Sequence, residues 1–174
     1  MPRAQRNGER RTEVSQGLPT AAARLILTRA QCDRMVAHVH AGLPNEACGL
    51  LGGVGEVVRG VYPIENVAAS PVRYTMDPVA QVRAMVAIEN EGWQLLGIFH
   101  SHPTGPPHPS PTDIAQAYYP DSVYVICAPD GRGEWRVKGF NLSGGAVAAV
   151  PLLVGEGASK TWGSACKQLH VIHE

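Results

Sequence analysis

The sequence predicts a single α/β domain, and three observations support this. Segments with the apolar spacing of helices alternate with short apolar runs that are typical of strands. The length of 174 residues suits one compact domain. Hydrophobic residues make up 44% of the chain, which is enough for a buried core. We expect one folded unit over residues 21–155, between an amino-terminal arm (1–20) and a carboxyl-terminal tail (156–174).

The folded unit is predicted to open with a strand and a helix. Residues 23–28 (ARLILT) form a short extended run. Thr28 and Gln31 then have the spacing of a capping box, in which each side chain bonds the backbone N–H of the other residue. Gly42 and Pro44 are expected to end the helix. Its core-facing residues are predicted to be Cys32, Met35, Val36 and Val39.

Two further extended runs look like a hairpin. They cover residues 46–53 (EACGLLGG) and 56–68 (EVVRGVYPIENVA), and Glu46 is expected to begin the first strand. Glycine favours turns because it adopts backbone conformations that other residues avoid. The glycines between the two runs are Gly52, Gly53 and Gly55.

A second helix is predicted to begin after Asp77, which can cap it, with Pro78 in the first helical position. Gly92 is expected to close it. The residues predicted to face the core are Val79, Val82, Met85 and Val86.

The strand at residues 93–99 (WQLLGIF) is dense in apolar residues and is expected to be buried on both faces. It leads into the polar sequence HSHPTGPPHPSPTD, where Ser110 is expected to start a short helix that runs to about Tyr119. Three more strands are predicted, at residues 123–128, 134–140 and 146–154.

Composition excludes several classes of function. Fifteen Lys and Arg balance fifteen Asp and Glu, so the sequence lacks the excess of positive charge that is typical of nucleic-acid-binding proteins. No apolar run approaches the roughly 18 residues that a membrane span requires. The amino-terminal MPRAQRNGERRTEVSQG lacks the apolar segment of a secretory signal. The four cysteines include no CxxC pair, so we expect reduced thiols and a cytoplasmic protein.

Three side chains have the chemistry of a catalytic zinc site, which uses three nitrogen or oxygen ligands and keeps one position open. His100 and His102 lie two apart in an extended segment, so both can point to the same side. The stiff loop from His102 to Asp113 is rich in proline and could bring that carboxylate back to the strand end. We therefore predict that these three residues bind Zn²⁺.

A zinc hydrolase also needs a base and a donor for the oxyanion. Glu46 is the candidate base, because an isolated carboxylate at the edge of an apolar strand is costly without a partner. Ser110 is the candidate donor. S-P-T-D is also a capping box in its own right, so a purely structural role for Ser110 and Asp113 stays open.

Other histidines and cysteines are weaker candidates. HxH pairs often lie on a solvated edge, so the prediction depends on the added Asp113. His108, between two prolines, is expected to be exposed and outside the site. Cys48 shares the predicted strand face of Glu46, where a buried structural thiol competes with a soft zinc ligand. His170 and His173 in the tail are expected to be solvated.

The pattern formed by these residues resembles the JAMM (MPN+) metalloproteases. It consists of a glutamate on an early strand (Glu46), then H-S-H-P from His100, then six residues, and then S-x-x-D from Ser110 to Asp113. The resemblance covers residues 22–154, including the order of elements around E-A-C-G-L-L-G.

The resemblance implies a mixed β-sheet flanked by helices, similar to the cytidine deaminase-like fold. It also implies zinc held by His100, His102 and Asp113, with Glu46 activating a water and Ser110 stabilising the intermediate. Such enzymes cleave peptide or isopeptide bonds after the carboxyl-terminal Gly-Gly of ubiquitin-like proteins. The E-A-C-G-L-L-G form looks most like the compact prokaryotic branch, which processes sulfur carriers and includes enzymes that release cysteine from a carrier.

The sequence leaves several questions open. RadC-like proteins share a similar H-x-H-P loop, although they carry an additional amino-terminal region. A binding module could hold a ubiquitin-like partner without cleaving it, and a homodimer stays open. A nucleobase deaminase would need H-x-E and P-C-x-x-C signatures, which are absent. Neither the physiological substrate nor the pathway follows from the residues.

Overall fold

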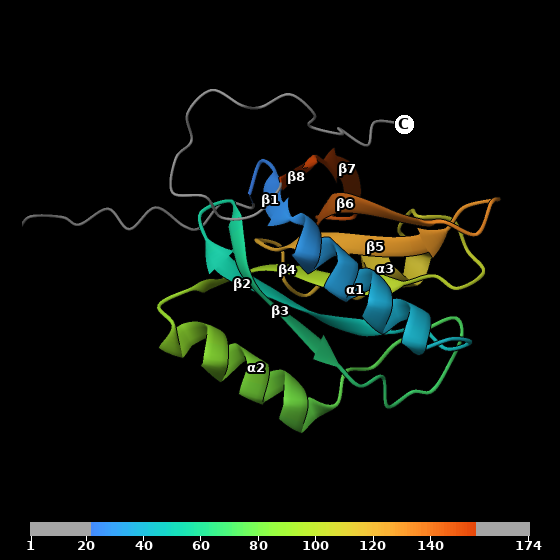
Figure 1. The fold of residues 1–174 in the computed structure, drawn as a ribbon, viewed down its shortest axis with the longest axis horizontal. Helices are drawn as coiled ribbons and strands as arrows, with labels where there is room; N and C mark the ends of the chain where they lie inside the picture. Colours follow the sequence, from blue (N-terminus) through green and yellow to red (C-terminus); the bar gives the residue numbers. More distant parts are fainter. Residues whose placement is uncertain (1–21, 156–174) are drawn as a thin grey trace, which may run out of the picture.

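The computed structural model describes residues 22–155, and its helices and strands form the predicted α/β domain (Figure 1). The predicted arm and tail, with Cys166, His170 and His173, lie outside the described residues, and the three-part division of the chain stays a prediction. The elements are β1 (Leu25–Thr28), α1 (Arg29–Ala41), β2 (Cys48–Val54), β3 (Val57–Ile64), α2 (Pro78–Asn90), β4 (Gln94–Ser101), α3 (Pro111–Ala115), β5 (Val123–Pro129), β6 (Trp135–Ser143), β7 (Ala146–Val150) and β8 (Leu152–Gly155).

All described strands belong to one mixed sheet, as expected. Its order is β7-β6-β5-β4-β2-β3-β1-β8. β4 lies near the centre, antiparallel to β2 on one side and parallel to β5 on the other. Six consecutive residues of β4 are buried, which confirms the predicted burial of this strand on both faces. The carboxyl-terminal end of β4 is therefore fixed from both sides.

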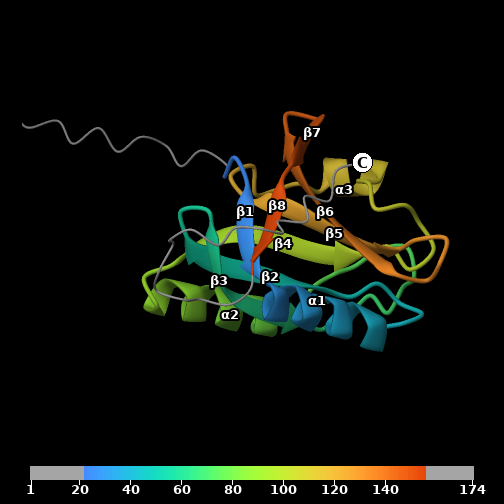
Figure 2. The same ribbon diagram turned by 45° about the horizontal axis from the view of Figure 1, so that its top comes forward.

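The last strand region differs from the prediction. The sequence suggested one strand over residues 146–154, whereas the structure contains two strands separated by Pro151. Proline has no backbone N–H for a ladder, but its carbonyl still accepts a hydrogen bond from the N–H of Leu25 at 2.9 Å. β7 pairs with β6, and β8 pairs with β1 (Figure 2). Two consecutive strands thus form opposite ends of the strand order, and the sheet curls back on itself.

The predicted β2–β3 hairpin is confirmed, with different boundaries. Gly52 and Gly53 lie inside β2, where the pairing register shifts, and the turn contains Gly55, with a φ of 60°. The expectation that Glu46 begins the strand is wrong, because the ladder starts at Cys48. Glu46 lies two residues before the strand, in a segment without regular β-ladder hydrogen bonds.

Gly49 is required for packing inside this hairpin. A Cβ atom at this position would overlap the ring of Phe99 and the carbonyl oxygen of Tyr62. Gly49→Ala is therefore expected to lower the free energy of unfolding by about 1–3 kcal/mol, as overpacked core positions do. Urea denaturation would measure this. Gly131→Ala is the control, because a Cβ there meets no atom within 4 Å; equal losses in the two variants would contradict the packing argument.

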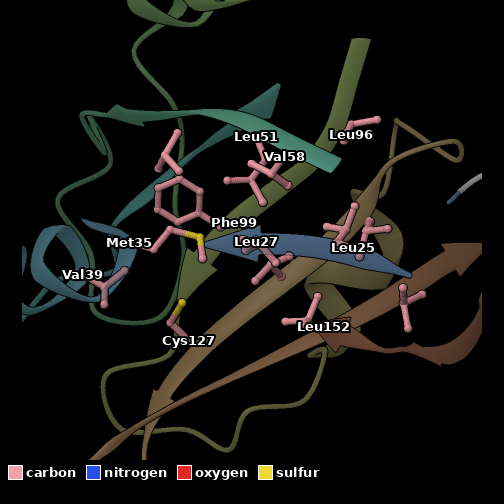
Figure 3. Packing of buried hydrophobic residues seen from close by; sticks show 14 of the residues in the cluster. Leu25, Leu27, Met35, Val39, Leu51, Val58, Leu96, Phe99, Cys127 and Leu152 are labelled. Carbon is pink, nitrogen blue, oxygen red and sulfur yellow. The ribbon is translucent and has the colours of Figure 1, made fainter. Parts of the chain in front are cut away.

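Helix α1 follows the prediction closely. The capping box is present, with the N–H of Gln31 donating to Thr28 Oγ1 at 3.2 Å and the N–H of Thr28 donating to Gln31 Oε1 at 2.8 Å. Met35 and Val39 are buried and Cys32 packs against the same core cluster, whereas the predicted core residue Val36 is only half-buried. Figure 3 shows the side chain of Met35 pointing into this cluster beside β1.

Helix α2 begins as predicted, because Asp77 accepts a hydrogen bond from the N–H of Ala80 at 2.7 Å. Its predicted core face is wrong except at Met85. Ala84 and Ile88 are buried, and Ile88 packs where Gly52 of β2 has no side chain. Met85 is partly buried. The other residues of the predicted face are exposed: Val79 (57%), Val82 (60%) and Val86 (48%).

Helix α3 is shorter than the sequence suggested. It ends at Ala115 with Gln116 as its cap, well before Tyr119, whose N–H donates to the hydroxyl of Tyr124. The helices of the described part are too short and polar for one to cross a membrane. α1 packs on one core cluster, whereas α2 and the α3 residue Ile114 pack on the other. The end of β4 and the start of α3 lie close together, since Nε2 of His100 is 3.3 Å from Oδ1 of Asp113.

Candidate metal centre

The structure brings the two predicted histidines and the predicted aspartate together. His100 is the second-to-last residue of β4, and His102 follows the end of this strand directly. Their Nε2 atoms are 3.0 Å apart. The proline-rich loop returns the chain so that Asp113 lies in the first turn of α3. Its Oδ1 is 3.3 Å from Nε2 of His100, and its Oδ2 is 3.2 Å from Nε2 of His102.

This cluster fits a metal ion. One ligand atom from each residue lies within 4.8 Å of the other two, and both histidines are buried. Two imidazole nitrogens 3.0 Å apart beside a carboxylate repel one another unless a proton or a metal cation lies between them. Two nitrogens and one oxygen match the three protein ligands of catalytic zinc sites.

The loop fixes the orientation of His102. Its Nδ1 lies 2.9 Å from the carbonyl oxygen of Pro106, which can only accept a hydrogen bond. Nδ1 therefore carries the proton, and Nε2 keeps its lone pair for a metal. Gly105 allows this approach, since a Cβ there would lie 3.3 Å from Cβ of His102.

His100 is held by packing. It is 0% exposed, and the ring of Tyr74 stacks on it at 4.7 Å with an interplanar angle of 27°. Among the described residues, Nδ1 of His100 has no hydrogen-bond partner. The Tyr74 contact was not predicted, because Tyr74 lies in an irregular segment before α2 with no motif around it.

Burial and the carboxylate shift the pKa values of the cluster in different directions. Burial lowers the pKa of His100, in spite of Asp113. Burial also lowers the pKa of His102, but hydrogen bonds to Asp113 and Pro106 outweigh it, so this pKa lies above its ordinary value. Burial raises the pKa of Asp113, yet the hydrogen bonds from both histidines hold it well below its usual range. Asp113 is therefore an anion, as a metal ligand must be.

Glu46 is buried next to this cluster, with 5% of its surface exposed. Burial raises its pKa from 4.5 to about 7. The charge of His102 lowers this pKa, whereas the charge of Asp113 raises it further. These electrostatic effects are those of a carboxyl close to His102 and Asp113. A carboxyl with a pKa near 7 can accept and release a proton at neutral pH.

The raised pKa of Glu46 predicts a pH-dependent stability of the zinc-free protein. The folded state keeps the proton between pH 4.5 and about 7, so stability falls as the pH rises through this range. Glu46→Gln has no charge to bury, so at pH 8 it should be more stable than the wild type by on the order of 2 kcal/mol. At pH 4 both side chains are neutral and the difference should vanish. Thermal unfolding in chelator at both pH values tests this, and an equal difference at pH 4 would contradict it.

Ser110 takes part in the capping box that its sequence suggested. Its N–H donates to Asp113 Oδ2 at 2.6 Å, and its Oγ accepts from the N–H of Asp113 at 3.2 Å. The capping box thus orients the Asp113 carboxylate toward the histidines. The hydroxyl hydrogen of Ser110 is not used by these two bonds, so it is free to donate.

Two weaker candidates from the sequence, Cys48 and His108, lie outside the metal cluster, which consists of His100, His102 and Asp113. Cys48 is fully buried, and its Sγ lies 3.6 Å from the carbonyl oxygen of Ile64. Burial raises the pKa of Cys48 to about 12, so this thiol is a structural one. His108 is exposed, as predicted, and its ring meets the edge of Phe140.

The chain is similar in sequence to several known proteins. The chain is 41% identical over 129 residues to a desampylase of Haloferax volcanii, covering 68% of this chain and 93% of that protein. It is 41% identical to a probable TtuB-protein conjugate cleaving protease of Thermus thermophilus (74% of this chain, 83% of the relative). It is 31% identical to a CysO-cysteine peptidase of Mycobacterium tuberculosis (76% and 92%).

A solved structure from Desulfitobacterium hafniense is similar in fold, with a TM-score of 0.70 and 36% identity, covering 78% of this chain and 96% of that one. The mixed sheet with flanking helices is thus confirmed. Residues 28–138 match the family described as prokaryotic homologs of the JAB domain. The match spans most of the described chain and includes every residue of the metal cluster, and the chain belongs to this family, as the resemblance to the JAMM metalloproteases predicted.

Proposed function

We propose that this chain is a zinc-dependent hydrolase that cleaves peptide or isopeptide bonds after the carboxyl-terminal Gly-Gly of a ubiquitin-like or sulfur-carrier protein. The observation that carries the proposal is the convergence of His100, His102 and Asp113 beside the buried Glu46. A ligand triad with an adjacent carboxyl of raised pKa is the arrangement that metal-assisted hydrolysis needs.

His100, His102 and Asp113 would hold the zinc, through Nε2 of each histidine and a carboxylate oxygen. Bound zinc would supply Lewis-acid polarisation of the scissile carbonyl and a lowered pKa for the attacking water. Pro106 contributes by fixing the tautomer of His102.

The other steps belong to the protein's own side chains. Glu46 takes a proton from the attacking water and passes it to the leaving nitrogen. Burial raises the pKa of this carboxyl, which makes it a stronger base than an exposed glutamate. The hydroxyl of Ser110 donates to the oxyanion that develops on the scissile carbonyl.

The substrate class is supported by the chemistry of the site and by its relatives. Both histidines are nearly inaccessible, so only a narrow segment can bring a carbonyl to them. A diglycine tail is narrow enough to reach them, because glycine has no side chain. One relative is named as a probable TtuB-protein conjugate cleaving protease and another as a CysO-cysteine peptidase. These names support both an isopeptidase and a cysteine-releasing activity.

The test uses purified full-length protein and a ubiquitin-like protein whose terminal Gly-Gly is joined to lysine or to cysteine. We expect one zinc per chain by elemental analysis, cleavage of at least one conjugate, loss of cleavage in chelator and recovery with added zinc. A matched conjugate with a bulky residue in place of the final glycine should resist cleavage. Zinc-free protein that cleaves equally well in chelator would overturn the proposal.

A binding module without turnover is the alternative. It predicts a stable complex with the conjugate and no product after zinc is restored. The retention of all three metal residues in one buried cluster favours the enzyme. A cytoplasmic location is part of the proposal and agrees with the free thiols of Cys32, Cys48 and Cys127. A homodimer stays a prediction.

A further inference from the structure

Hydrogen bonds hold the backbone of Glu46 and Ala47, the two residues that precede β2. The N–H of Glu46 donates to the carbonyl of Ser70 at 2.9 Å, and the carbonyl of Glu46 accepts from Nδ2 of Asn66 at 2.9 Å. The N–H of Ala47 donates to Oγ of Ser101 at 2.9 Å, and its carbonyl accepts from the N–H of Ser101 at 3.0 Å. Every backbone polar atom of the two residues therefore has a partner.

Ser101 makes the connection to the metal ligands. It lies between His100 and His102, and strand alternation directs its side chain away from the metal cluster. The regular pairing of β2 with β4 starts at Cys48, which lies opposite His100, and Ala47 immediately precedes Cys48 in the chain. Ser101, which is 0% exposed, continues this pairing through its N–H and its side chain. The segment that carries Glu46 is thus tied directly to the segment that carries both histidines.

Asn66 makes the second connection. Its Nδ2 donates to the carbonyls of Glu46 and Arg73, at 2.9 and 3.1 Å. Its Oδ1 accepts from the N–H groups of Ala68 and Thr75, at 3.1 and 2.9 Å. All four hydrogen-bonding positions of the amide are occupied. This one side chain therefore shapes the loop before α2 and fastens it to Glu46.

We propose that Ser101 and Asn66 are positioning residues that set the Glu46 carboxyl at its working distance from the metal ligands. The inference rests on the proposed role of Glu46 as the base. A general base must lie within about 2.6–3.2 Å of the atom that gives up its proton. A displacement of about 1 Å can lower a rate roughly 100-fold. Glu46 lies outside the regular ladder of β2. The hydrogen bonds of the side chains of Ser101 and Asn66 therefore fix its position in place of ladder hydrogen bonds.

The test compares Ser101→Ala and Asn66→Asp with a matched control. Aspartate keeps the oxygen that accepts from Ala68 and Thr75 but cannot donate to Glu46. We expect each variant to lower kcat about 10- to 100-fold with KM changed less than about twofold. Ser101→Thr keeps the hydroxyl and should restore most of kcat. The control is Ser122→Ala, since Ser122 is also buried and donates to the carbonyl of Leu95 at 3.3 Å, at the other end of β4.

Two readouts separate positioning from a general structural effect. Zinc content and the absorption spectrum of the cobalt-substituted protein should match the wild type in Ser101→Ala and Asn66→Asp, because the ligands are untouched. Thermal unfolding should show a loss of stability comparable to that of Ser122→Ala, which keeps full activity. An altered cobalt spectrum, or an equal loss of kcat in Ser122→Ala, would overturn the inference.

A double-mutant cycle tests whether the effect passes through Glu46. In a Glu46→Gln background, under single-turnover conditions, Ser101→Ala should cause no further loss of rate. The same fold-loss as in the wild type would mean that Ser101 acts independently of Glu46, and the inference would be wrong. If Glu46→Gln alone retained the wild-type rate, the assignment of Glu46 as base would fail instead, and the two failures are thereby distinguished.

Discussion

Replacing Asp113 by asparagine is expected to remove zinc from the protein and to abolish hydrolysis. Asparagine keeps the size of the side chain and an oxygen that can accept from the N–H of Ser110, but it loses the negative charge. Both histidine Nε2 atoms lie within 3.3 Å of this carboxylate. Loss of a group that merely supports a metal ligand lowers affinity roughly 10- to 100-fold, and loss of an anionic ligand should exceed this.

Zinc content after purification and competition against a chelator would measure the affinity. Asp77→Asn is a matched control, because Asp77 also caps a helix through a carboxylate oxygen and lies outside the metal cluster. This control should bind zinc as the wild type does. If Asp113→Asn kept wild-type affinity, Asp113 would not be a ligand and its role would be the capping of α3 alone.

The metal cluster could be predicted from the sequence because its determinants are local. Two histidines at strand spacing share a side, and the stiff loop with a capping box at its end limits where Asp113 can lie. Glu46 was different, since no local rule links it to residues 54 or more positions away. The structure supplies that link through the pairing of Ala47 with Ser101, which brings Glu46 close enough to His102 and Asp113 for their charges to shift its pKa.

The core face of α2 could not be predicted because apolar residues occupy more than one side of this helix. Val79, Val82 and Val86 have regular helical spacing, but so do Ala84 and Ile88. The choice depends on a tertiary contact, the space that Gly52 leaves for Ile88. The stacking of Tyr74 on His100 was missed for the same reason. The break at Pro151, by contrast, could have been predicted, since proline is rare inside a paired strand.

Replacing Glu46 by glutamine is expected to lower kcat by about 100- to 10,000-fold while zinc stays bound. Glutamine has nearly the same shape but cannot take a proton from the attacking water, and general acid–base catalysis contributes a factor of this size. The ligand cluster contains His100, His102 and Asp113 without Glu46, so the metal should remain. KM should change little, because the substrate tail binds before proton transfer.

Steady-state kinetics and zinc analysis on the same preparation would test this. Glu56→Gln is the matched control, since Glu56 pairs with Arg24 at the surface and should be replaceable without loss of rate. Loss of zinc in Glu46→Gln would make Glu46 a ligand, and full activity would exclude it as the base. Glu46→Gln is expected to lose kcat, to keep its zinc and to be more stable than the wild type at pH 8. These results together would show that the charged form of Glu46, which acts as the base, also lowers the stability of the fold.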